Sequence, residues 1–291
     1  MEFAFFLEGV AAPVATLVVL ILIGNRFWRL KDERQADPLP AIACGIALTV
    51  AFFAMFPKTA VPPKEHWQWI LVVIWSATAA ALIMPLISRI TILRMVMWIA
   101  TSLALAWLVF PTWEIFADKR NWWVGGIAIA IFANLESTSH LSRKRHGLSP
   151  LFMVTIGTIL TSIVVVLANQ AKFAQICGSI AAVLGFLFLV CLLLDKREPI
   201  RGSMAFPSIL IPVLAFLAYF FNPDSDGKSF PTAYVLTSIT PLMVAIATLC
   251  PMGKLKGWKR FAVVQVLSII PVAIAVVMLL MTASTEDPYS Y

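Results

Sequence analysis

The chain of 291 residues is 60% hydrophobic and only 13% charged, a composition outside the range of soluble domains. Its net charge of +7 is no argument for a nucleic-acid partner, because basic residues collect in the cytoplasmic loops of any protein that crosses a membrane several times. Ten spans of about 20 residues would leave about 90 residues for connections, too few for a soluble domain. We therefore expect residues 1–291 to form a single integral membrane domain.

Ten apolar segments follow one another along the chain, each about as long as a bilayer-spanning helix requires. All of them are predicted to be α-helical, because backbone polar groups in lipid must find their hydrogen-bond partners within the segment. The predicted fold class is an all-α polytopic transmembrane helical bundle of about ten spans. The predicted spans are residues 9–28, 39–56, 67–87, 90–110, 122–141, 151–168, 173–194, 203–221, 232–250 and 261–282.

The Lys and Arg residues are divided unequally between the two sets of connections. Those at the first, third, fifth, seventh and ninth connections number 16, and those at the even-numbered connections number 6. Positively charged loops are retained in the cytoplasm, so this asymmetry predicts that both termini lie on the non-cytoplasmic side. The clean bias, with no cysteine in the predicted outer loops to form a disulfide, favours a bacterial inner membrane.

Ionisable residues within a membrane are costly and often functional, yet no charge lies near the predicted midplane of a span. The deepest candidates are Glu136 on the fifth segment and Arg94 on the fourth, each about one turn inside the cytoplasmic edge. Because consecutive segments run antiparallel, the two side chains can meet and offset much of each other's desolvation. We expect Arg94, Asn134 and Glu136 to line a cytoplasmic vestibule. The alternative is a purely structural pair, or side chains that extend to water.

A proline falls near the middle of each of the last three segments, where it removes a backbone hydrogen bond. The ninth segment is the most suggestive, because a proline follows three hydroxyl side chains in the sequence TSITP, and the tenth adds further polarity. Broken helices whose freed carbonyl groups face a cavity form the midplane site of many transporters. The alternative is that the hydroxyl groups satisfy the backbone locally. The candidate solute-binding residues in these two segments are Thr237, Ser238, Thr240, Pro241, Gln265 and Ser268.

No residue pattern in the chain predicts a catalytic centre, a metal site or a cofactor. His140 follows Glu136 by about one helical turn, but a metal ion needs further ligands in matching positions. The sequence therefore does not favour an enzyme.

These features favour a permease-like carrier of a small neutral or weakly polar solute. A second interpretation is a non-catalytic subunit or assembly factor of a larger membrane complex, which fits the short loops and the lack of an intramembrane charge pathway. A third, an integral membrane lipid-modifying enzyme, rests only on Glu136 and His140. The expected partners are the lipid bilayer and either other membrane subunits or further copies of this chain, and no nucleic acid.

Overall fold

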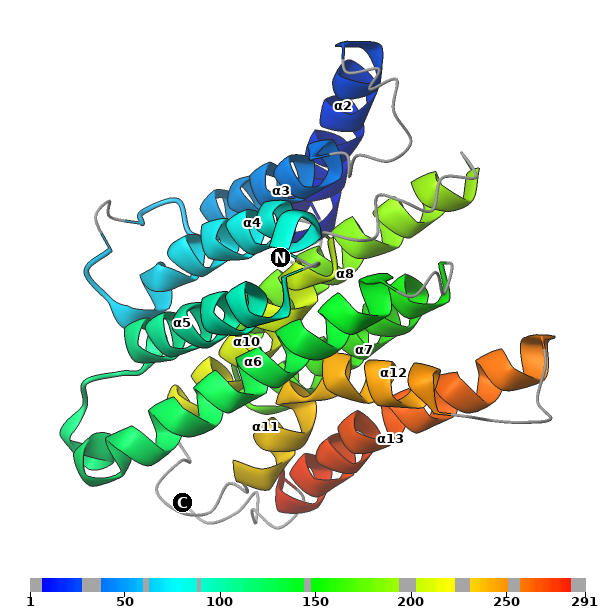
Figure 1. The fold of residues 1–291 in the computed structure, drawn as a ribbon. Helices are drawn as coiled ribbons and strands as arrows, with labels where there is room; N and C mark the ends of the chain where they lie inside the picture. Colours follow the sequence, from blue (N-terminus) through cyan, green and yellow to red (C-terminus); the bar gives the residue numbers. More distant parts are fainter. Residues whose placement is uncertain are drawn as a thin grey trace.

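The computed structural model describes residues 7–27, 38–59, 63–87, 90–143, 148–193, 203–222, 231–250 and 257–283. Within these ranges the chain forms a bundle of helices and no strands (Figure 1). Short 3-10 helices precede α4 and α6, at His66–Trp69 and Glu114–Lys119, and a π-helical turn, Leu7–Ala11, precedes α2. The α-helices are α2 (Ala12–Phe27), α3 (Leu39–Met55), α4 (Ile70–Ile87), α5 (Thr91–Val109), α6 (Arg120–Arg143), α7 (Ser149–Leu167), α8 (Ala171–Leu193), α10 (Ala205–Phe220), α11 (Pro231–Ser238), α12 (Thr240–Leu249) and α13 (Gly257–Ala283).

Each of the ten predicted segments coincides with a helical stretch of the described chain. No observed end differs from its predicted position by more than four residues. The ninth segment differs in form, because it consists of two helices, α11 and α12, with a bend of 50° between them. The interruption lies beside Pro241, where the missing N–H group predicts a weak point in the helix.

By length and composition, five described helices are long and apolar enough to cross a membrane, or six if α11 and α12 count as one bent span. Three further apolar helices, at Leu7–Ile23 and in α3 and α10, have 17 residues or fewer. The helices are thus compatible with an integral membrane protein, while ten crossings remain a prediction. The five long helices are His66–Ile87, Thr91–Val109, Ser149–Leu167, Ala171–Leu193 and Trp258–Met281.

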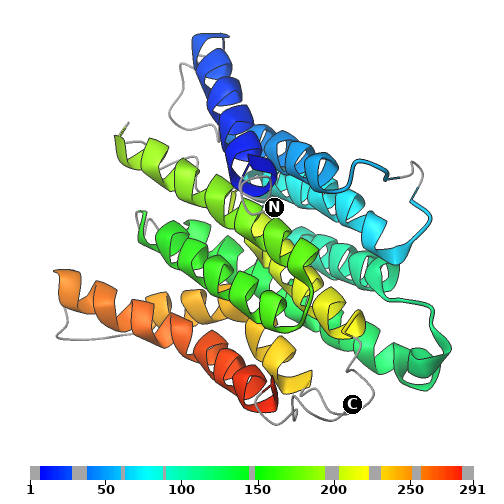
Figure 2. The same ribbon diagram turned by 180° about the vertical axis from the view of Figure 1, so that it is seen from behind.

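Helix α10 lies in the middle of the bundle, as the views from both sides show (Figures 1 and 2). Every residue of α10 is buried, and the helix packs against α4, α6, α7, α8 and α11. A helix that is apolar on all sides can be covered in this way without leaving polar groups unsatisfied. The centre of the bundle is therefore a short, almost entirely apolar helix.

The turns that follow α3, α5, α7 and α10 gather at one end of the bundle. Nε2 of His66 lies 3.2 Å from Oγ1 of Thr112, and Nε2 of Gln170 donates a hydrogen bond of 2.7 Å to the carbonyl oxygen of Phe221. These contacts join turns far apart in the sequence, so consecutive helices alternate in direction. Most basic connections and both termini lie outside the described residues, and the side of the membrane on which each end lies remains a prediction.

The same end of the bundle holds an aromatic cluster around the last turn of α10. The ring of Phe220 lies 5.2 Å from that of Phe110, 5.1 Å from Phe116 and 5.5 Å from Trp123, centroid to centroid. Trp122, next to Trp123 in the sequence, is 84% exposed. We call Phe110, Phe116, Trp123, Tyr219 and Phe220 the aromatic cluster; it fills this end of the bundle with packed rings.

Candidate functional site

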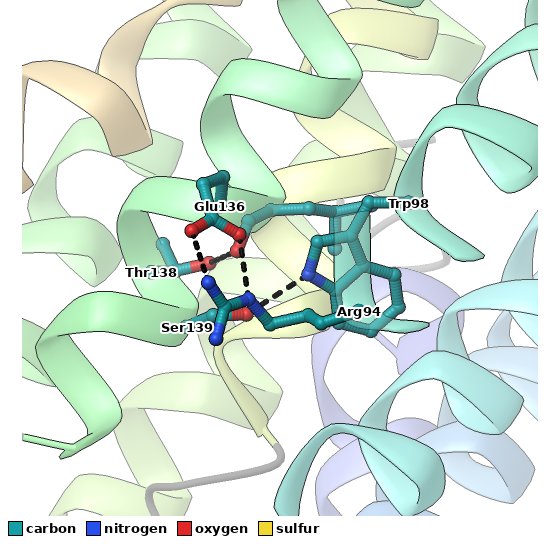
Figure 3. A network of polar contacts seen from close by, with 6 residues as sticks. Arg94, Trp98, Glu136, Thr138 and Ser139 are labelled. Carbon is teal, nitrogen blue, oxygen red and sulfur yellow. Dashed lines mark hydrogen bonds and ion pairs between the residues drawn. The ribbon is translucent and has the colours of Figure 1, made fainter. Parts of the chain in front are cut away.

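Arg94 on α5 and Glu136 on α6 form a bidentate ion pair (Figure 3). Nε of Arg94 donates to Oε2 of Glu136 at 2.8 Å, and Nη2 donates to Oε1 at 2.6 Å. The planar guanidinium group matches a carboxylate in this geometry, which makes such pairs strong and directional. The pairing expected from the sequence is therefore present. The Arg94 side chain is 3% exposed and that of Glu136 is 29% exposed, so Glu136 is the more accessible partner.

The turn of α6 that carries Glu136 also bonds to two neighbouring helices (Figure 3). On one side, Nε1 of Trp98 on α5 donates to Oγ of Ser139 at 3.2 Å. On the other, the hydroxyl oxygens of Thr138 and Ser208 lie 2.9 Å apart, which joins α6 to the central helix α10. All four of these side chains are buried. The position of α6 is thus fixed by polar contacts on both sides.

The interruption between α11 and α12 leaves few backbone groups without partners. Pro241 has no N–H group to donate to the carbonyl of Thr237, and Oγ1 of Thr240 donates to that carbonyl instead, at 2.7 Å. The Thr237 hydroxyl bonds to the carbonyl of Ala233, and the Ser238 hydroxyl to that of Val235. The hydroxyl side chains predicted to bind a solute therefore satisfy the backbone of their own segment.

Asn134 supplies the remaining partners at this interruption from α6. Its Nδ2 donates to the carbonyl oxygen of Ser238 at 2.7 Å, and its Oδ1 accepts from the N–H of Leu242 at 2.9 Å. In a continuous α-helix, the N–H of Leu242 would donate directly to the carbonyl of Ser238. The Asn134 amide is therefore inserted into a single hydrogen bond of the helix. Asn134 and Ser238 are fully buried, so the amide satisfies groups that water does not reach.

Gly157 on α7 leaves room for the first turn of α12. A Cβ atom at this position would lie 2.5 Å from Cγ2 of Thr240, too close for any side chain. The missing side chain thus lets α7 approach the residue that replaces the hydrogen bond lost at Pro241.

The last two candidates lie on α13, which packs against both α11 and α12. The Ser268 hydroxyl donates to the carbonyl of Val264 in its own helix, at 2.7 Å. Both amide atoms of Gln265 are buried without a hydrogen-bond partner among the described residues. Within the described residues, neither side chain bonds to the Asn134 amide or to the interruption. The structure thus brings Asn134 to the broken segment but leaves Gln265 and Ser268 apart from that contact.

Sequence reasoning missed several members of this network. Ser208 is the one small polar side chain in an otherwise apolar helix, which is a usable signal for a hydroxyl with a specific partner. Trp98 and Ser139 gave no comparable signal, because tryptophan and serine are ordinary residues of membrane helices. Among the described residues, no group of three His, Cys, Asp or Glu side chains could hold a metal ion.

Comparison of the chain with protein-family models, with curated proteins and with solved structures finds no match. Inference about its function therefore rests on the broken segment and on the polar contacts that surround it.

Proposed function

We propose that the protein is a permease-like carrier that moves a small neutral or weakly polar solute across a membrane. The observation that carries the proposal is the interrupted helix α11–α12, whose bent backbone is held by a side chain from another helix. Interrupted membrane helices expose backbone donors and acceptors within the bundle, and transporters use such groups to bind solutes. The carbonyl of Ser238 and the N–H of Leu242 are an acceptor and a donor of this kind, and in this structure the Asn134 amide occupies both.

A neutral solute fits the charges around the interruption. The groups within bonding distance of the bend are amide, hydroxyl and backbone groups, contributed by Asn134, Thr240 and their partners. The charges of Arg94 and Glu136 neutralise each other in a bidentate pair. A charged solute in a membrane interior would need an uncompensated opposite charge close by.

The difference between the two ends of the bundle also supports a carrier. The aromatic cluster packs tightly at one end, while Glu136, near the C-terminal end of α6, keeps part of its side chain exposed. A carrier must close one side of its pathway while the other is open. We propose that this structure represents the form closed at the end that the charge pattern assigns to the outside.

A second candidate is a subunit of a larger membrane complex, which the outer face of α5 favours. Ile92, Val96 and Leu103 on this helix are at least half exposed, and Trp107 is 56% exposed. Partner helices would cover such a face, as would lipid. The two candidates predict different results on purification: a carrier is purified without other polypeptides, and a subunit is purified with them.

Transport by reconstituted protein tests the carrier. The purified chain in liposomes is assayed for counterflow of radiolabelled glycerol and urea, as wild type and as Pro241→Ala. The variant restores an N–H donor, and one hydrogen bond of about 1 kcal/mol shifts the equilibrium towards the straight helix about fivefold. We expect the wild type to show counterflow of at least one solute. Pro241→Ala should show counterflow that is about fivefold slower.

Pro271→Ala is the matched control, because Pro271 lies inside the continuous helix α13. Counterflow by this variant should equal that of the wild type. Equal rates for Pro241→Ala, Pro271→Ala and wild type would exclude the bend from transport. No counterflow of any solute, by folded protein, would contradict the carrier itself.

A further inference from the structure

We infer that Asn134 is a positioning residue, whose side-chain amide holds α11 and α12 in their bent arrangement. Without that amide, the two helices close into a straighter span. Only the part that this straightening plays in transport rests on the proposed function. The bend itself can be measured without a solute.

The side-chain amide of Asn134 replaces one backbone hydrogen bond between α11 and α12. A side-chain carboxamide carries one acceptor and one donor side by side, as a peptide group does. Asn134 uses both, giving its N–H to the carbonyl of Ser238 and accepting the N–H of Leu242. These two backbone groups are four residues apart, the spacing of a normal helical hydrogen bond. The amide therefore separates two groups that would otherwise bond to each other.

Removal of the Asn134 amide differs from the loss of most buried hydrogen-bond partners, because the two backbone groups that it leaves can bond to each other. Loss of one partner normally strands a buried donor or acceptor. Here the stranded carbonyl of Ser238 and N–H of Leu242 are each other's natural partners. The carbonyl of Thr237, which Pro241 cannot serve, already has the hydroxyl of Thr240. Straightening therefore leaves each of these backbone groups with a partner.

The position of Asn134 is controlled by the rest of α6. The Arg94–Glu136 ion pair lies about half a turn further along the same helix and fixes α6 to α5. The Thr138–Ser208 contact, one turn from Asn134, fixes α6 to α10. A shift of α6 against these neighbours would withdraw the amide from the interruption. The bent segment is thus coupled to the one ion pair within the described residues.

The distance between two spin labels tests the inference on the full chain. One label is placed on Cys250, the exposed cysteine at the end of α12, while Cys44, Cys177 and Cys191 are buried. The other is placed on Leu86→Cys, at a residue that is 77% exposed near the end of α4. Helix α12 has ten residues, so it is about 15 Å long, and loss of half of the 50° bend moves its end by about 6 Å.

The variants are Asn134→Ala, which removes the amide, and Asn134→Leu, which also fills its volume without polar atoms. Each should shift the mean distance between the labels in folded protein, by at most the roughly 6 Å through which the end of α12 moves. Ser162→Ala is the matched control, because it removes a 2.8 Å hydrogen bond from a side chain of α7 to the backbone of α8 and none at the interruption. Its distance distribution should coincide with that of the parent.

Unchanged distances in folded Asn134→Ala or Asn134→Leu would overturn the inference, because the bend would then not depend on the amide. Failure of both variants to fold would overturn it as well, since Asn134 would be needed for stability alone. A distance shift accompanied by unchanged counterflow would leave the positioning role standing and remove its part in transport. Absence of counterflow in wild-type protein would contradict the proposed function without bearing on the distances.

Discussion

At the scale of single residues, the Arg94–Glu136 pair predicts an unequal response to substitution. Glu136→Leu removes the carboxylate that pairs with the buried guanidinium group, which costs about 3 kcal/mol of unfolding free energy. The double variant Arg94→Met/Glu136→Leu removes that buried charge, so it should recover most of the loss. Thermal unfolding of the purified variants measures both effects. A double variant that is less stable than Glu136→Leu alone would contradict the role assigned to the buried charge.

The sequence allowed this pair to be predicted but not the contact of Asn134. Arg94 and Glu136 lie at similar depths on consecutive apolar segments, and two opposite charges in such positions have few other partners. Asn134 instead bonds to backbone atoms of residues 104 and 108 positions further along the chain. Every residue carries those backbone groups, so no side-chain pattern identifies the partner. Only the packing of α6 against α12 brings them together.

At the scale of elements, the end of α10 should contribute strongly to stability. Phe220 is 2% exposed and contacts the four other rings of the aromatic cluster. Phe220→Ala should lower the unfolding free energy by about 3–5 kcal/mol, because it leaves a cavity among packed rings. Trp122→Ala, at an exposed aromatic residue nearby, should change it by no more than about 0.5 kcal/mol. If thermal unfolding showed that Phe220→Ala and Trp122→Ala lower the unfolding free energy by comparable amounts, the aromatic cluster would not be what stabilises this end of the bundle.

The positions of the helices followed from apolar length, and the sequence also favoured the ninth segment for an interruption, but it did not show what holds that interruption. Pro212 and Pro271 lie inside the continuous helices α10 and α13, and only the segment with Pro241 is divided. The three prolines remove the same backbone donor, so proline by itself does not decide the outcome. The divided segment differs in having an amide from another helix at the bend. That difference depends on tertiary packing and leaves no mark in the local sequence.

At the scale of the whole molecule, the charge pattern predicts which end faces the cytoplasm. Cys250 ends α12 beside a basic connection, so a membrane-impermeant maleimide should label it in inverted vesicles and not in intact cells. Asp118→Cys, in the turn before α6, should show the opposite behaviour. Labelling of Cys250 from outside intact cells would contradict the predicted topology and place this end of α12 on the outer side.

The central claim is that this chain acts on its own as a carrier, and the mass of the native particle tests it most directly. A tagged full-length chain is extracted under mild conditions and its composition is determined by native mass spectrometry. We expect a single species made of this chain and lipid alone, as one copy or a defined number of copies. Other polypeptides present in a fixed ratio would contradict it and identify the protein as a subunit of their complex.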